Sequence, residues 1–169
     1  TPVAEKYGVK LGLHPVDPPM PEVGGVPQLL YNFEGYKRLI DIVDSPYNSI
    51  LLCQGAFSHR AVSDQDNGES IYDMIEYFVK RERVLYVHFR NVEGTVPKFH
   101  ETFVNKGYVD MYKAMRTYAE NGFDGFFMDD HVPMTKGDTA WGHRAKAYAN
   151  GYIQSLIETV TDTSLYGLH

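Results

Sequence analysis

The sequence predicts an α/β protein built from parallel (β/α) units, about four of them, forming the C-terminal half of a (β/α)8 barrel. Short apolar runs alternate with helical patterns four times along the chain, which is typical of strands joined by crossover helices. A chemically active side chain also ends or follows each apolar run. With 169 residues, 43% of them hydrophobic, the chain is expected to form a single domain, residues 1–169, with a buried core.

The first unit begins with the apolar run Val9–Leu13, which ends at His14 and Pro15. Proline cannot donate to a strand ladder, so this strand must stop here. Three further prolines extend the break. A helix is predicted over 33–43 because its apolar side chains recur at helical spacing. These are Tyr36, Leu39, Ile40 and Val43.

The second strand is predicted over Ser49–Cys53 and is followed by Gln54 and Gly55. A polar loop then leads to a helix from Ser70 to about Arg81. The loop contains Asp64, Asp66, Asn67 and Gly68.

The third strand is predicted over Val84–Phe89, followed by a loop and a helix from about Asp110 to Asn121. Gly122 stands where the residue after a helix commonly takes the left-handed conformation. The fourth strand is Gly125–Met128, and a last helix is expected from about Thr139 to Thr159.

Four units are half of a barrel, and they would leave an open sheet edge on each side. Two other arrangements satisfy the same pattern: a small open sheet, or a half barrel completed by another polypeptide. We favour a fragment of a full barrel. The chain opens at Thr1 inside a helical pattern, so we expect its natural N-terminus to lie upstream.

Composition excludes several classes of protein. The net charge of −6 disfavours binding to nucleic acid, which depends on Lys and Arg contacts to phosphate. The sequence contains no apolar run near the ~18 residues that span a bilayer, and no secretory signal pattern. A single cysteine, Cys53, fits a reducing compartment, and we expect a cytoplasmic protein with no membrane partner.

Four side chains occupy the same place in the four units, at the carboxyl end of each predicted strand. They are separated by 39, 35 and 42 residues. In a (β/α)8 barrel the strand ends converge on the catalytic rim. Two imidazoles, a thiolate and a carboxylate suit a divalent transition metal. The predicted ligands are His14, Cys53, His88 and Asp130.

Taken singly, each of these residues has a simpler interpretation. A cysteine or histidine in an apolar strand is more often part of the core, and an aspartate after a strand often caps a turn. The shared position in four successive units is what favours a metal site.

A second group of polar residues follows the third strand. Arg90 and Asn91 are candidates for binding an acidic substrate, since guanidinium binds carboxylates in a bidentate fork. Arg90 in a structural ion pair is the competing interpretation. His100 and Glu101 are further substrate-site or acid–base candidates.

His131 would stand beside the metal, next to Asp130, and is the preferred group for proton transfer. The three remaining histidines are expected at the surface: His59, His143 and His169. Three aromatic residues near the last helix are expected to pack on its face: Trp141, Tyr148 and Tyr152.

Six motifs, in order, resemble those of mannonate dehydratases. His14-Pro15-Val16-Asp17-Pro18-Pro19 resembles that family's His-Pro-Asp-Asp-Pro-Pro, and Leu52-Cys53-Gln54-Gly55 its Leu-Cys-x-Gly. His88-Phe89-Arg90-Asn91-Val92 matches His-x-Arg-Asn-Val, and Asp130-His131 matches the family's Asp-His. Phe99-His100-Glu101 and Val109-Asp110-Met111-Tyr112 complete the set.

The resemblance implies a xylose-isomerase-like barrel that dehydrates the sugar acid D-mannonate to 2-keto-3-deoxy-D-gluconate in glucuronate catabolism. It also implies Mn²⁺ or Fe²⁺ on His14, Cys53, His88 and Asp130, and a homo-oligomer, expected to be a dimer. The chain departs from the family at Met128-Asp129, where the family has Arg-Pro, and at Val132, where it has Gly. A family tyrosine proposed as an acid–base group has no certain counterpart here.

Two other functions stay open at this point. One is a sugar isomerase or epimerase on the same barrel, although those enzymes usually gather Glu, Asp and His around the metal rather than Cys. The other is an inactive barrel fragment that needs a partner.

Overall fold

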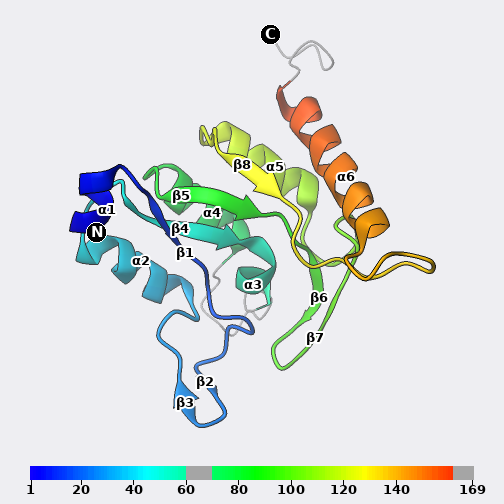
Figure 1. The fold of residues 1–169 in the computed structure, drawn as a ribbon, viewed down its shortest axis with the longest axis horizontal. Coiled ribbons are helices and arrows are strands. Elements are labelled where there is room, and N and C mark those ends of the chain that lie inside the picture. Colours follow the sequence, from blue (N-terminus) through cyan, green and yellow to red (C-terminus); the bar gives the residue numbers. More distant parts are fainter. Residues whose placement is uncertain (60–69, 162–169) are drawn as a thin grey trace.

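A computed structural model describes residues 1–59 and 70–161 of the chain. The predicted polar loop through Asp64 to Gly68 and the position of His169 lie outside these ranges. A four-stranded parallel sheet in the order β1-β4-β5-β8 forms the centre of the fold, as predicted (Figure 1). Its strands are β1 Leu11–Leu13, β4 Asn48–Cys53, β5 Val84–His88 and β8 Phe126–Met128.

Helices cover one face of this sheet (Figure 1). The main core lies between them and the sheet, and includes Ile50, Leu52 and Val87 from the strands together with helical side chains such as Met74 and Tyr118. The helices are α1 Pro2–Tyr7, α2 Phe33–Ile42, α3 Gln54–Ser58, α4 Ile71–Val79, α5 Met111–Glu120 and α6 His143–Thr161.

The three predicted helices after the first three strands all form, and each begins at a polar cap. The side chains of Asn32, Ser70 and Asp110 accept hydrogen bonds from backbone N–H groups in the first turns of α2, α4 and α5. Such caps satisfy donors that a helix start leaves unpaired. The sequence pattern and the local chemistry therefore agree for these elements.

The last helix begins later than predicted, at His143 instead of Thr139. Asp138 accepts hydrogen bonds from the backbone N–H groups of Thr139, Arg144 and Ala145, which holds residues 139–142 in a turn ahead of the helix. Those bonds lower the pKa of Asp138 to about 2. Gly142, with φ of 67°, completes the turn in a conformation that favours glycine.

Two antiparallel hairpins were not predicted. β2 Glu22–Val23 pairs with β3 Val26–Pro27, and β6 Val92–Thr95 pairs with β7 Lys98–Glu101. The second hairpin occupies the stretch expected to be a loop after the third strand. Both hairpins project below the sheet in Figure 1. They are short and partly exposed, so they carry little of the hydrophobic alternation that predicts strands.

The other face of the sheet bears apolar side chains that no helix in the described part of the chain covers. Leu11, Leu13, Phe126 and Met128, on the two outer strands, are each at least 40% exposed. Leu51, Cys53 and Ala56 form a small buried cluster between them, with Tyr86 packed against it. This is the face that points inward when such units form a barrel.

Within residues 1–59 and 70–161, no helix has the length and apolar character needed to cross a membrane.

Candidate metal centre

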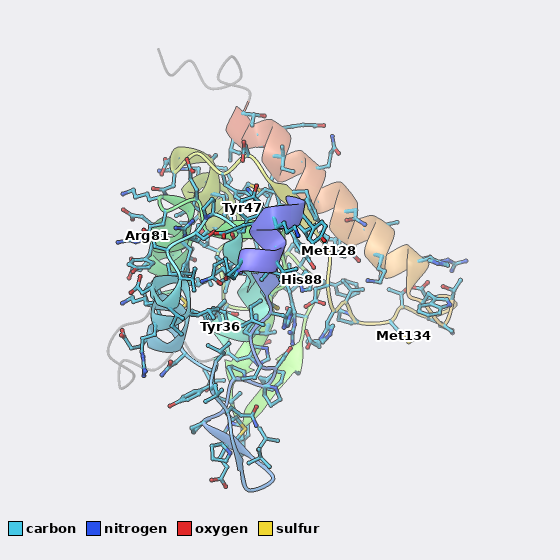
Figure 2. The ribbon with its side chains drawn as sticks, turned by 60° about the vertical axis from the view of Figure 1, so that its left-hand side comes forward. Tyr36, Tyr47, Arg81, His88, Met128 and Met134 are labelled. Atoms are coloured by element: carbon cyan, nitrogen blue, oxygen red, sulfur yellow. The ribbon has the colours of Figure 1, made fainter. Side chains whose placement is uncertain are left out.

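The four predicted metal ligands come together at the carboxyl end of the sheet. Cys53 and His88 are paired across β4 and β5 as the last residues of their strands. His14 follows β1 directly, and Asp130 lies two residues beyond Met128, which pairs with His88. Figure 2 labels His88 and Met128 at this end of the sheet. Parallel pairing thus places residues far apart in the sequence on one rim.

The distances among these side chains suit a single ion. The potential ligand atoms of His14, Cys53 and His88 all lie within 4.8 Å of one another. Ligands at roughly 2.0–2.3 Å from one metal are separated by up to about 4.5 Å, so the bound of 4.8 Å is close to the spacing of a single metal site. Asp130 joins them through one carboxylate oxygen, which is 3.6 Å from Cys53 Sγ and 3.7 Å from His88 Nδ1.

The two histidines present nitrogen atoms in the form that a metal requires. Nδ1 of His88 is buried and has no hydrogen-bond partner among residues 1–59 and 70–161, and burial lowers the pKa of this imidazole. Nδ1 of His14 lies 2.6 Å from the carbonyl oxygen of Pro15. With its proton on Nδ1, His14 would donate this bond and leave Nε2 free as a metal ligand.

The thiol of Cys53 is fully buried. Burial, and secondarily the negative charge of Asp130, raise its pKa to about 12. The side chain is therefore a neutral thiol in the metal-free protein. A buried imidazole nitrogen, a buried thiol and a neighbouring carboxylate are donors that suit a divalent transition metal.

Arg90 lies behind this cluster and joins three segments of the chain. Its guanidinium donates to Glu101 in a bidentate pair through Nε and Nη2, with an Nε–Oε2 distance of 2.9 Å, and to Asp17 through its third nitrogen, Nη1. It also donates to Nε2 of His59, and lies 3.7 Å from Asp130. The side chain is only 1% exposed. The structural ion pair that competed with substrate binding in the sequence interpretation is therefore present.

Gly55 is required for this arrangement. A Cβ atom at position 55 would collide with the aliphatic part of Arg90, which its ion pairs hold in place. The glycine of the Leu-Cys-Gln-Gly motif thus makes room for the arginine of the His-Phe-Arg-Asn motif.

Glu101 contacts two of the candidate residues. Besides Arg90, its carboxylate lies 3.1 Å from Nδ1 of His131. The other nitrogen of His131 is 3.7 Å from Asp130, and the side chain is 57% exposed. His131 is therefore at the solvent-facing mouth of the cluster, with its ring oriented by a carboxylate.

Asn91 and His100 are placed differently. The Asn91 amide donates to the carbonyls of Val104 and Val109 and holds the loop between them. His100 is exposed and pairs with Glu93 across the β6–β7 hairpin. Because side chains alternate along a strand, His100 points away from the side on which Glu101 meets Arg90. The substrate-binding assignments of Arg90, Asn91, His100 and Glu101 stay predictions.

Sequence reasoning missed Asp17 and His59. Asp17 shares the His14 motif, so its spacing could have indicated a role in the site. His59 was expected at the surface, but it is fully buried between Arg90 and Phe99. No sequence pattern marked it, because its burial comes from the β6–β7 hairpin folding over α3. Trp141, expected to pack, is 78% exposed and precedes α6.

We expect the protein to lose stability as the pH falls from 7.5 to 5. Burial, and next the charge of Arg90, lower the pKa of His59 from 6.5 to about 4. At pH values between about 4 and 6.5, His59 is protonated in the unfolded chain but neutral in the folded protein. Its contribution to the free energy of unfolding is therefore full above pH 6.5 and is lost progressively as the pH falls toward 4. The expected loss is about 1–2 kcal/mol at pH 5.

Urea unfolding at several pH values measures this effect. His59→Gln should flatten the pH dependence over this range, with His143→Gln as the control at an exposed histidine. An unchanged slope in His59→Gln would show that other groups cause the loss.

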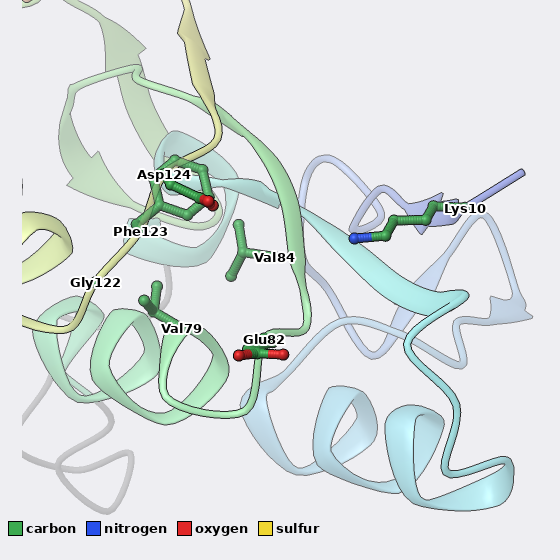
Figure 3. A pocket seen from close by; sticks show the side chains of 7 residues that line it. All are labelled: Lys10, Val79, Glu82, Val84, Gly122, Phe123 and Asp124. Atoms are coloured by element: carbon green, nitrogen blue, oxygen red, sulfur yellow. The ribbon is translucent and has the colours of Figure 1, made fainter. Parts of the chain in front are cut away.

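A cavity lies at the opposite end of the sheet from the candidate metal centre. It has a volume of about 280 Å³ and is lined by residues that precede or begin the strands, among them Lys10, Val84 and Asp124 (Figure 3). Both signs of charge line it, and none of the predicted site residues does. In barrels of this kind, chemistry takes place at the carboxyl ends of the strands, so we assign no catalytic role to this cavity.

Fold and site together define an α/β protein of the barrel class, with candidate metal ligands on the carboxyl rim of parallel strands. Residues 1–165 match the model of the family described as D-mannonate dehydratase (UxuA). The chain belongs to this family. The expectation of a half-barrel of the mannonate dehydratase type is confirmed.

Individual relatives agree. The chain is 33% identical to a mannonate dehydratase of Lactococcus lactis, covering 96% of this chain and 46% of the relative. It is 36% identical to a mannonate dehydratase of Thermotoga neapolitana, covering 95% of this chain and 44% of that relative. The chain spans about half the length of the curated relatives that it matches.

Solved structures show the same relation. A crystal structure of mannonate dehydratase from Streptococcus suis superposes with a TM-score of 0.86 at 28% identity, covering 96% of this chain and 46% of that one. A xylose isomerase domain protein from Alicyclobacillus acidocaldarius has a TM-score of 0.68 at 16% identity, which shows the shared fold alone.

Proposed function

We propose that this chain provides the metal centre of a hydro-lyase that converts D-mannonate to 2-keto-3-deoxy-D-gluconate. The observation that carries the proposal is the clustering of the ligand atoms of His14, Cys53 and His88 within 4.8 Å of one another, with an Asp130 oxygen 3.6 Å from Cys53 and 3.7 Å from His88. Family membership supports the substrate and the reaction. A sugar acid is then the partner, and a reducing cytoplasmic location suits the buried free thiol of Cys53.

The reaction removes the proton on C2 of the sugar acid and expels the hydroxyl on C3. The proton on C2 is a weak acid, because its loss adds negative charge beside an existing carboxylate. A bound Mn²⁺ or Fe²⁺ would supply Lewis acidity that offsets this charge. In the proposal, His14, Cys53, His88 and Asp130 hold that ion.

His131 is the proposed proton-transfer group. It stands at the open side of the cluster, and Glu101 accepts a hydrogen bond from its Nδ1 when that nitrogen carries the proton. The opposite nitrogen then faces the region beside Asp130, where a substrate would lie.

Arg90 acts in the proposal mainly by holding Glu101 and Asp17 in place. Its donors are already bonded to protein groups, so binding of a substrate carboxylate would require one of these pairs to open. Asn91, His100 and Glu101 remain proposed contacts of the substrate region.

The first test is elemental analysis of the gently purified chain. Near-stoichiometric Mn or Fe is expected, and a keto-deoxy acid should form from D-mannonate once a second set of strands covers the inward face of the sheet. Interconversion of ketoses without loss of water would instead favour an isomerase. A chain that neither contains nor takes up Mn²⁺ would overturn the proposed centre.

One observation favours a requirement for a further half barrel. The inward face of the sheet leaves Leu11, Leu13, Phe126 and Met128 exposed beside the metal centre, and water there would weaken every electrostatic interaction in the site. We therefore expect Mn²⁺ binding by the chain alone but little turnover until a second set of strands covers this face. Mass measurement by light scattering distinguishes a self-associated pair from a monomer.

A further inference from the structure

The position of Asp130 is not explained by the sheet. β8 has only three residues, lies at an outer edge and pairs with β5 alone. Its last ladder contact is the bond from the Phe89 N–H to the Met128 carbonyl. Asp130 lies two residues further on, in a segment without regular structure, yet it must be held to a fraction of an ångström to serve as a metal ligand.

Helix α6 supplies the missing support. Nζ of Lys146 donates to the Asp129 carboxylate at 2.8 Å and to the backbone carbonyl of Asp130 at 3.1 Å. Asn150, one turn further along the same face of α6, donates to the other carboxylate oxygen of Asp129 at 3.3 Å. The Asp129 side chain is only 12% exposed.

The helix that carries these donors is itself fixed. Ala145, Ala149, Ile153 and Leu156 are buried along one side of α6, which seats it against the core. Its start is held by Asp138. Lys146 therefore reaches the segment after β8 from a fixed helix. In Figure 1, α6 lies beside the chain that leaves β8.

The geometry also separates the two neighbouring carboxylates. Successive side chains of an extended segment point to opposite sides, so when Asp129 faces α6, Asp130 faces Cys53 and His88. The charge of Lys146 neutralises Asp129 and keeps it from competing for the ion. Lys146 thus offsets the repulsion between the carboxylates of Asp129 and Asp130, and its bond to the Asp130 carbonyl holds the backbone of that residue.

We propose that Lys146 and Asp129 form a tether that positions Asp130 as a metal ligand. This inference rests on the proposed metal centre. Lys146 and Asp129 are positioning residues, which act on the ligand Asp130 and touch neither metal nor substrate.

The test compares Lys146→Met with Gln154→Met, which places the same side chain at an exposed position two turns further along α6. We expect Lys146→Met to weaken Mn²⁺ binding about tenfold by calorimetric titration, the usual loss when an outer partner of a ligand is removed. Gln154→Met should bind as the unmodified protein does. Lys146→Arg, which keeps the charge and donors, should restore part of the affinity.

A second readout needs no metal. Hydrogen exchange of the metal-free protein should quicken several-fold in the peptide that contains β8 and Asp130 in Lys146→Met, and not in Gln154→Met. Asp129→Asn should reproduce both effects, and the double variant should add little. Unchanged exchange in Lys146→Met would overturn the tether, even if no Mn²⁺ bound. An unchanged affinity in a protein that does bind Mn²⁺ would also overturn it. Mn²⁺ binding without dehydration of D-mannonate, in a protein whose inward sheet face is covered by a second set of strands, would count against the proposed reaction while leaving the tether supported.

Discussion

Replacing Cys53 with serine is expected to lower the affinity for Mn²⁺ or Fe²⁺ by more than about 100-fold, since even residues that only support ligands contribute 10–100-fold. A serine hydroxyl is a far weaker acid than a thiol and supplies no anionic donor at neutral pH. The side chain is fully buried and faces Asp130 and His88, so no water-exposed group can take its place without movement. Calorimetric titration of the metal-free protein measures the change.

Met128→Leu is the matched control for this experiment. Met128 pairs with His88 at the same end of the sheet and lies on the same face, but it offers no strong ligand for Mn²⁺. Met128→Leu should leave the affinity within about twofold of that of the unmodified protein, because the substitution nearly conserves volume and lies outside the proposed ligand set. If Cys53→Ser kept both metal content and turnover at the unmodified level, Cys53 would not be a ligand.

Replacing Arg90 with methionine is expected to lower the free energy of unfolding by about 3 kcal/mol, the lower end of the range for breaking a buried ion pair. The guanidinium is 1% exposed, whereas the Asp17 and Glu101 side chains are 20% and 30% exposed and can regain some water. The loss arises because two carboxylates would remain beside Asp130 without a cation. Urea unfolding of the metal-free protein at pH 7.5 measures it.

Arg116→Met is the control for the Arg90 experiment. Arg116 pairs with Glu120 one turn along α5, and both side chains are more than half exposed. Exposed pairs of this kind contribute about 0.3–0.5 kcal/mol. Arg90→Lys should give an intermediate loss, because lysine keeps the charge but not the bidentate fork. A loss below about 1 kcal/mol in Arg90→Met would mean that the acids find other partners.

The sequence by itself determined the four strands, three of the main helices and the four residues that share the carboxyl rim. Apolar runs and helical spacing are local signals, and parallel pairing then carries His14, Cys53, His88 and Asp130 to one edge. The last helix was also expected, but its start at His143 depended on the bonds that Asp138 makes.

Only the tertiary structure decided what surrounds those ligands. The burial of His59 depends on a hairpin whose strands are too short and too exposed to show a pattern. The meeting of Arg90 with Asp17 and Glu101, and of Lys146 with Asp129, joins residues 11 to 73 positions apart through long side chains. Periodicity reports which face of an element is buried, but not which charged groups reach each other across elements, because that depends on the packing of the whole chain.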